Sequence, residues 1–264
     1  MIRVLAEKLS RQRILKRRLP SRFSSTPLYV SPDSQLKYLK LGSGAFDQDL
    51  LTIADQYINE YSQVWDIGAN VGVFAFAAAS LAKRGAVLAV EADIWLAQLM
   101  KKSLALKKNN KLNLKILPSA ISDQCGVATF FISKRGRALN SLKIVGGGII
   151  EGIRDEVVVP TLTLDSLLDF FHAPSFIKID VEGAEAYVLR GSRKILEYIR
   201  PVIYIEVCSE ANEEVMAIFN EWNYILFDGS KNIEEQEPLS VCKFNTLAIP
   251  REKQGECPLN FNHP

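Results

Sequence analysis

Short apolar strands and amphipathic helices alternate along most of this chain, and that alternation restricts the fold more than any other feature. The expected strands are 63–67, 86–91, 112–117, 176–179, 202–206, 224–227 and 244–249. The expected helices are 50–61, 71–82, 93–108, 164–171, 184–199 with an interruption at Gly191, and 213–222. Strands joined by helices of this length form right-handed βαβ units, so we predict an α/β fold with a mostly parallel sheet covered on both faces. No helix separates the last two strands, so the last one is expected to run antiparallel.

The same pattern divides the chain into parts. Residues 1–45 are expected to form a basic tail and an irregular lead-in with one strand near 36–41, and residues 251–264 a C-terminal tail. Residues 46–250 form the predicted domain. Within it, strands expected at 127–132 and 156–159 flank a glycine-bearing stretch, so residues 126–160 are interpreted as an insertion.

Positive charge is concentrated near the N-terminus. The chain has a net charge of +2, but residues 1–22 carry +7 and the remainder is mildly acidic. An acidic body argues against a dedicated nucleic-acid face. Leu5, Leu9 and Ile14 lie among the basic residues of the tail, which allows peripheral contact with an anionic membrane; a solvated tail is the more ordinary alternative.

Cysteine and histidine are too few and too scattered for a metal centre of the zinc-finger kind. The four cysteines form no CxxC pair, and His172 and His263 are the two histidines. No secretory signal is recognisable at the N-terminus, and the apolar stretch from Val71 to Ala82 is too short to span a bilayer. A cytoplasmic location is expected.

A glycine turn between the first strand and its helix predicts a nucleotide site. Gly68 and Gly72 bracket Ala69, Asn70 and Val71, and Glu91 ends the next strand. Helix N-termini favour anionic groups, and an acidic residue at that strand end suits ribose hydroxyls. The second and third glycines of the GxGxxG fingerprint are absent, which disfavours NAD.

Asp66, just before this turn, suits the ammonium group of a ligand better than a pyrophosphate. The expected cofactor is therefore an adenosine that carries an amino acid, such as S-adenosylmethionine. Other interpretations stay open, because Asn70 can simply cap a helix and Glu91 can simply end a strand in solvent.

A second dense motif, Phe176-Ile-Lys-Ile-Asp-Val-Glu-Gly-Ala-Glu185, places charged residues at the carboxyl end of a buried strand. Ligands of open α/β sheets bind at this edge. Asp180 is the first candidate for a general base or metal ligand, Glu182 the second, and Glu206, at the end of the following strand, the third. An ion pair with one of these carboxylates is the expected role of Lys178.

These motifs, together with Ala120-Ile-Ser-Asp123, Thr163-Leu-Asp165, Val188-Leu-Arg-Gly191 and Pro201-Val-Ile-Tyr-Ile-Glu206, resemble the FkbM family of S-adenosylmethionine-dependent methyltransferases over roughly residues 45–250. The resemblance implies a Rossmann-like class I methyltransferase fold with a seven-stranded sheet whose last strand is antiparallel. It also implies O-methylation of a hydroxyl group on a sugar, a polyketide or another small molecule. Family members often have proline after the ribose-binding glutamate, where this chain has Ala92.

Further site residues are assigned by position. Ala92, Ala120 and Asp123 are candidates for the adenine pocket, and Asp180 is a candidate for cofactor contact as well as catalysis. Asn140 and Ser141 are candidates for orienting the acceptor. The sequence leaves open whether the protein depends on a divalent metal. It also leaves open two alternative functions, a non-catalytic adapter that binds the cofactor and a nucleotide-dependent oxidoreductase.

Overall fold

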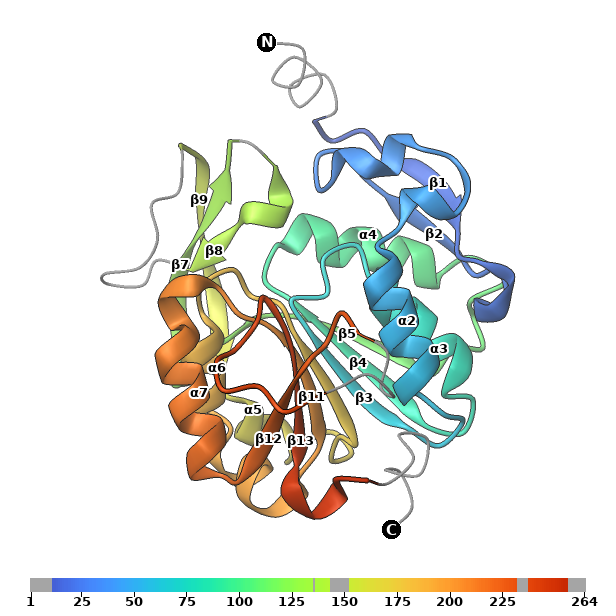
Figure 1. Ribbon diagram of the computed structural model, residues 1–264. Helices are drawn as coiled ribbons and strands as arrows, with labels where there is room; N and C mark the ends of the chain where they lie inside the picture. Colours follow the sequence, from blue (N-terminus) through green and yellow to red (C-terminus); the bar gives the residue numbers. More distant parts are fainter. Residues whose placement is uncertain (1–10, 135, 143–151, 232–236, 256–264) are drawn as a thin grey trace.

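The computed structural model describes residues 11–134, 136–142, 152–231 and 237–255, and in this part of the chain a seven-stranded sheet forms the centre (Figure 1). The strand order is β5-β4-β3-β10-β11-β13-β12. The bounds are β3 Gln63–Ile67, β4 Ala86–Glu91, β5 Leu114–Pro118, β10 Phe176–Ile179, β11 Val202–Glu206, β12 Tyr224–Asp228 and β13 Asn245–Pro250. Each agrees with its predicted strand to within two residues.

Strand direction also follows the prediction. β3, β4, β5, β10 and β11 pair in parallel, whereas β13 runs antiparallel to both of its neighbours, β11 and β12. This is the Rossmann-like sheet of class I methyltransferases. The order reverses between β3 and β10, and at such a switch point the carboxyl ends of the strands leave a crevice for ligands.

Helices cover both faces of the sheet, and each face has its own apolar core (Figure 1). The helices are α2 Gln48–Tyr57, α3 Val73–Leu81, α4 Ile94–Leu104, α5 Leu164–Leu167, α6 Glu185–Arg190 and α7 Asn212–Glu221. The first three pack on one face and the last three on the other. The interruption expected at Gly191 in the helical stretch 184–199 is confirmed, and the chain resumes as a π-helical turn, Ile195–Ile199. Within the described residues, no helix has the length and apolarity needed to cross a membrane.

The predicted insertion, together with Ala120–Ile121 before it, forms a second, four-stranded sheet in the order β6-β9-β7-β8. Its strands are β6 Ala120–Ile121, β7 Gly126–Ser133, β8 Ser141–Leu142 and β9 Ile153–Leu162, with a short 3-10 helix, Arg137–Leu139, between β7 and β8. The strands expected at 127–132 and 156–159 are thereby confirmed. Much of the glycine-bearing stretch, 143–151, lies outside the described residues.

The lead-in is more regular than the sequence suggested. β1 Leu15–Arg18 and β2 Pro27–Val30 pair as an antiparallel hairpin that packs on α4. The side chains of Leu19, Phe23 and Leu28 are buried there. The strand predicted near 36–41 is wrong, because Leu36–Leu39 forms a 3-10 helix that buries Tyr38 and leaves Leu39 in solvent.

Short 3-10 turns complete the description, at Ser21–Phe23, Gly42–Ala45, Ser209–Ala211 and Arg251–Lys253. The predicted tails at 1–10 and 256–264 lie outside the described residues, as do Leu5, Leu9 and His263.

Candidate functional site

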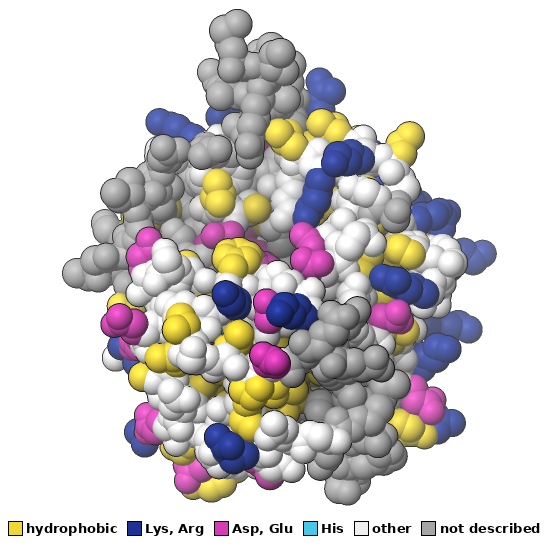
Figure 2. All heavy atoms as spheres, viewed as in Figure 1, with side chains coloured by type: hydrophobic (Ala, Val, Ile, Leu, Met, Phe, Trp, Pro, Cys, Tyr) yellow, Lys and Arg dark blue, Asp and Glu magenta, His cyan; other side chains and the backbone are white. Residues whose placement is uncertain are grey.

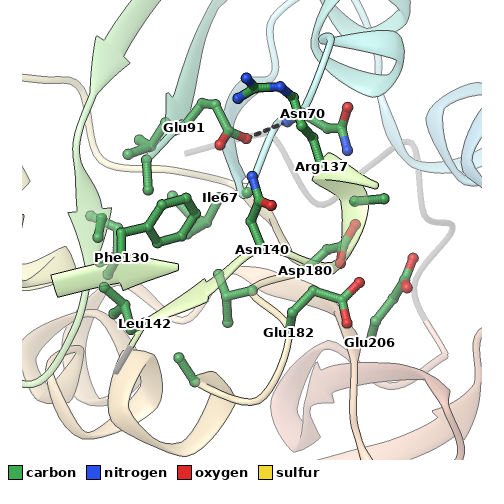
Figure 3. Close-up of a pocket in the computed structure, with 18 of the residues that line it drawn as sticks. Ile67, Asn70, Glu91, Phe130, Arg137, Asn140, Leu142, Asp180, Glu182 and Glu206 are labelled. Atoms are coloured by element: carbon green, nitrogen blue, oxygen red, sulfur yellow. Dashed lines mark hydrogen bonds between the residues drawn. The ribbon is translucent and has the colours of Figure 1, made fainter. Parts of the chain in front are cut away.

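A cavity lies where β3, β4, β10 and β11 end (Figure 3). About 880 Å³ of its space is free of protein atoms, part of it open to solvent. Nine residues expected at the site line it: Gly68, Asn70, Glu91, Ala92, Ala120, Asn140, Asp180, Glu182 and Glu206. The sheet topology therefore brings together residues that are up to 138 positions apart in the chain.

The turn after β3 depends on a residue without a side chain at Gly68. Its φ of +75° is left-handed, and a Cβ atom there would lie 1.8 Å from the backbone oxygen of Asp180. Glycine therefore allows β3 and β10 to approach each other at the cavity floor. Gly72, at φ +85°, lies outside the lining of the cavity, and a Cβ there would meet the Met100 sulfur at 2.9 Å.

Glu91 joins the turn to the end of β4. Its Oε2 accepts the backbone N–H of Asn70 at 2.6 Å, and its Oε1 accepts that of Asp93 at 2.8 Å. Burial raises the pKa of Glu91 to about 7, although both N–H groups oppose the rise. Each carboxylate oxygen has further acceptor capacity beyond its one N–H partner. Figure 3 shows the carboxylate at the cavity wall.

Asn70 holds the turn by several contacts at once. It has a left-handed φ of +55°, and its Oδ1 accepts the N–H of Val71 at 2.8 Å and the hydroxyl of Ser34 at 2.5 Å. Asparagine tolerates this backbone region better than most residues because its side chain bonds locally. Ala69 does not reach the main cavity but lines a smaller hollow beside it.

Asp66 is placed differently from the expectation that it meets a ligand's ammonium group. Its side chain is fully buried, and its Oδ1 lies 3.4 Å from the Nζ of Lys178. The same Nζ lies 3.2 Å from Asp180 Oδ2, which is the ion pair expected of Lys178, whereas its pair with Asp66 was not predicted. An ammonium group of the protein's own therefore occupies the position beside Asp66.

Electrostatics around Lys178 follow from this arrangement. Burial by itself would lower the pKa of Lys178, but the carboxylates of Asp180, Asp66 and Glu206 outweigh it and hold that pKa above its ordinary value. Burial raises the pKa of Asp66, and Lys178 opposes the rise. The buried lysine thus stays charged and neutralises part of a strongly acidic cavity floor.

Two glutamates at the cavity hold their protons more tightly than usual. Burial and the charge of Asp180 raise the pKa of Glu206 to about 7. Glu182 is an exposed residue, but partial desolvation by the surrounding protein and the charges of Asp180 and Glu206 raise the pKa of its carboxyl group to about 8. In Figure 3 the side chains of Asp180, Glu182 and Glu206 lie along one side of the cavity. Glu182 also has a left-handed φ of +48°, a strained conformation that is found preferentially at functional sites.

The opposite wall is apolar. Ala92, Ala120 and Leu142 line it together with Phe130, and the four belong to one small cluster that joins the main sheet to the insertion. Ser141 points away, because neighbouring residues of a strand face opposite sides and Leu142 faces the cavity. Asp123 does not line the cavity either, and its Oδ1 accepts the hydroxyl of Ser122 at 3.2 Å.

Three chain segments meet above the cavity through charged groups that the sequence did not reveal. Arg137 of the insertion lines the cavity and bonds to Asp33 of the lead-in at 3.2 Å and to Asp93 at the start of α4. Its guanidinium also lies 4.7 Å from the Trp95 ring. Asp93 caps α4, since its Oδ1 accepts the N–H of Trp95, but no local pattern predicts its long-range partners.

Asn140, expected to orient an acceptor, is held by the protein itself. Its Nδ2 donates to Asp93 at 2.9 Å, and its Oδ1 accepts the N–H of Ser133 at 2.9 Å. It lines the cavity nonetheless, and the second hydrogen of its amide group is available to a ligand.

No group of three histidine, cysteine, aspartate or glutamate side chains within the described ranges is arranged to hold a metal ion. His172 is exposed beside Gln63 and Ala86, which begin β3 and β4, so it lies at the edge of the sheet remote from the cavity. It is the surface histidine that its loop position predicts.

Comparison with known proteins gives one family. The model of the methyltransferase FkbM domain matches residues 66–226, which include the glycine turn, Glu91 and the acidic cluster. A search of curated proteins returned no match.

Solved structures show remote likeness. A methyltransferase FkbM from Methylobacillus flagellatus KT is 13% identical, with a TM-score of 0.48 over 82% of this chain and 58% of that one. Precorrin-6y C5,15-methyltransferase from Geobacter metallireducens GS-15 is 12% identical, with a TM-score of 0.43 over 76% and 85%. An S-adenosylmethionine-dependent O-methyltransferase from Thermotoga maritima is 13% identical, with a TM-score of 0.41 over 77% and 64%.

Proposed function

Because the chain belongs to the FkbM family of methyltransferases, we propose that it transfers a methyl group from S-adenosylmethionine to a hydroxyl group of a sugar, a glycan or another small molecule. One observation carries the proposal: the ribose-binding candidate Glu91 and the carboxylates of Asp180, Glu182 and Glu206 line the same cavity. A candidate diol-binding group and candidate proton acceptors thus line the cavity in which we propose that the cofactor and the acceptor bind together.

The lining residues fit the parts of the cofactor. Glu91 has acceptor capacity for two ribose hydroxyls, and the apolar wall of Ala92, Ala120, Phe130 and Leu142 suits a flat adenine ring. The smaller hollow beside Ala69 and Asn70 is contiguous with the cavity through Gln35, Asp47 and Asp180, which line both. It suits the polar methionine end.

The acidic side of the cavity supplies the base. S-adenosylmethionine, when bound, provides an electrophilic methyl group on a sulfonium centre. The acceptor oxygen forms a bond to the methyl carbon as the carbon–sulfur bond breaks, and the hydroxyl proton passes to a carboxylate. A base is most effective when its pKa is near the working pH, and the pKa of Glu182, at about 8, meets this condition.

Asp180 then acts by position rather than as the base. Its pairing with Lys178 at 3.2 Å holds the carboxylate in place and satisfies part of its charge. Glu206, on the neighbouring strand, is the second candidate for the proton acceptor, because its pKa is raised to about 7.

The test is transfer of labelled methyl from S-adenosylmethionine into an extract of small metabolites and glycans, followed by identification of the product. We expect a methyl ether, and we expect calorimetry to detect binding of S-adenosylhomocysteine but not of NADH. Cofactor binding with no labelled product across hydroxylated acceptors would contradict catalysis and favour the adapter function. Preference for NADH would favour an oxidoreductase.

A further inference from the structure

The lead-in hairpin and the last turns of α4 form a basic surface, in which Arg22 lies 3.9 Å from Asp55 of α2. Residues 11–32 contain six Lys and Arg and no Asp or Glu, and residues 94–122 contain six Lys and no Asp or Glu. The two stretches pack together, since Ser103 accepts the N–H of Tyr29 at 2.8 Å and Asn109 donates to Pro27 at 2.7 Å. Twelve positive charges therefore lie in adjacent segments of an otherwise acidic body.

Most of these cations point into solvent. Arg11, Arg13, Lys16, Arg18 and Arg22 are exposed, and in β1 the exposed Lys16 and Arg18 share one side of the strand. On α4 and the segment after it, Lys101, Lys102, Lys107, Lys108 and Lys111 are exposed as well. Figure 2 shows Lys and Arg side chains at the top and along the right-hand edge of the molecule, the side on which the hairpin lies in Figure 1.

Apolar side chains stand beside this charge. Ile14, which precedes β1, is 42% exposed, Leu39 53% and Leu41 83%. Arg17 of β1 points to the opposite face of the strand from Lys16 and Arg18 and donates to the backbone oxygens of Tyr38 and Lys40. The chain that carries both leucines is therefore fixed against β1, on the other side of this strand from those two cations. Exposed leucines next to lysine and arginine suit the interface of a lipid bilayer, whereas nucleic-acid sites are built from basic and aromatic or polar groups.

The surface adjoins the cavity. Gln35 and Asp47 both line the cavity, and Leu39 and Leu41 project from the chain between them. Shortly before β1, the N–H of Gln12 donates to Asp33. Asp33 in turn accepts a hydrogen bond from Arg137, which lines the cavity. A planar partner that covered the two leucines would lie next to the cavity entrance.

We propose that the surface formed by Arg11, Arg13, Ile14, Lys16, Arg18, Leu39 and Leu41 binds an anionic lipid bilayer, so that the acceptor hydroxyl is carried by a molecule at the membrane surface. Binding to the bilayer is inferred from charge and exposed apolar residues alone. The location of the acceptor at the membrane rests on the proposed methyltransferase function. Basic side chains supply long-range attraction to acidic headgroups, and the leucines supply burial at the level of the headgroups.

The test uses the full chain and sedimentation with vesicles of phosphatidylcholine alone or mixed with phosphatidylserine. We expect binding to the mixed vesicles only. The double variant Lys16→Glu with Arg18→Glu should weaken it by roughly tenfold or more, because each basic side chain near an acidic surface strengthens binding several-fold. Leu39→Ser with Leu41→Ser should weaken it as well.

Arg193→Glu with Lys194→Glu is the matched control. It reverses the same charge on exposed residues, and Arg193 lies over the Trp222 ring as Lys16 lies over that of Tyr29. The adjoining Ile195 and Leu196 pack in the core on the other face of the sheet. Binding by this control should stay close to that of the unmodified protein, and melting temperatures should show that all variants fold.

Three results would overturn the inference: no preference for mixed vesicles, equal loss in the control, or binding to single-stranded RNA with no vesicle binding. Vesicle binding is measured without cofactor, and S-adenosylhomocysteine binding is measured by calorimetry on the same samples. A protein that binds S-adenosylhomocysteine but no vesicle refutes the docking surface alone. One that binds vesicles but no S-adenosylhomocysteine refutes the proposed function alone.

Discussion

Glu91 accepts the backbone N–H of Asn70 across 2.6 Å, so the end of β4 is tied to the turn that follows β3. The bond forms although 21 residues separate the two positions, and it draws the carboxylate toward the cavity instead of into bulk solvent. The same carboxylate that stabilises the turn is therefore also the one that we propose binds the ribose.

Glu91→Gln should weaken binding of S-adenosylhomocysteine by roughly a hundredfold, because two charge-assisted hydrogen bonds of about 1.5 kcal/mol each are lost. Isothermal titration calorimetry measures the affinity, with Asp123→Asn as the control, since Asp123 lies outside the cavity lining. Equal affinity of Glu91→Gln and the unmodified protein would remove Glu91 from the site.

Gly68→Ala should lower both stability and cofactor affinity, because the added Cβ would meet the Asp180 oxygen at 1.8 Å. Gly42→Ala is a matched control for backbone strain: Gly42 has a similar φ of +67° and no atom within 4 Å of a built Cβ. The control should lose about 1 kcal/mol in the free energy of unfolding, and Gly68→Ala clearly more. Equal losses in urea denaturation would show that the close approach of β10 is unimportant.

Lys178→Met should lower the free energy of unfolding by about 3 to 5 kcal/mol, because it leaves the fully buried Asp66 beside no cation. Adding Asp66→Asn in the same chain should recover part of the loss, since the uncompensated charge is then gone. Denaturation of the two single variants and the double variant measures the coupling. Strictly additive losses of the free energy of unfolding would mean that Lys178 and Asp66 have no measurable interaction energy.

Glu206→Gln should change the dependence of stability on pH. The folded-state pKa of Glu206 is about 7 against an ordinary 4.5, so the folded state holds this proton more tightly than the unfolded chain does. Stability from this group is present below pH 4.5 and is lost as the pH rises through 7. The variant should therefore gain stability relative to the unmodified protein at the alkaline end, on the order of 1 kcal/mol. Parallel stability curves across this range would contradict the raised pKa.

Glu182→Gln should reduce kcat by roughly a hundredfold and leave S-adenosylhomocysteine affinity almost unchanged, as expected of a general base. In the unmodified enzyme, the rate should rise with pH toward a plateau above pH 8, because the base acts when deprotonated and its pKa is about 8. Asp228→Asn, an exposed carboxylate beside Ser230, serves as the control for charge removal. A flat pH profile would exclude Glu182 and direct attention to Glu206.

The strands that build the cavity were predictable because their signals are local. β3, β4, β10 and β11 are short apolar runs that end in acidic or glycine residues, and both properties can be seen without knowing the partners. That Glu91 ends β4 beside the turn was predictable as well, whereas its bond to the N–H of Asn70 was not predicted.

The network above the cavity was not predictable, since its signals are non-local. Arg137 lies 104 residues from Asp33 and 44 from Asp93, and none of the three belongs to a motif. Asn140 was assigned to the acceptor from its place in the insertion, whereas the structure engages both ends of its amide with Asp93 and Ser133. The hairpin was missed because its two strands have four residues each and are stabilised by packing on α4.

The reversed direction of β13 has a practical consequence for handling the protein. Pro250 pairs with Tyr224, the first residue of β12, so the chain leaves the sheet at the edge opposite the cavity. Once the exposed native Cys125 has been replaced, a biotin or a fluorophore on the variant Arg251→Cys would therefore lie far from the cavity and its entrance. When the protein is immobilised on a sensor chip through this label, the cavity entrance would face the solution and stay accessible to a dissolved ligand.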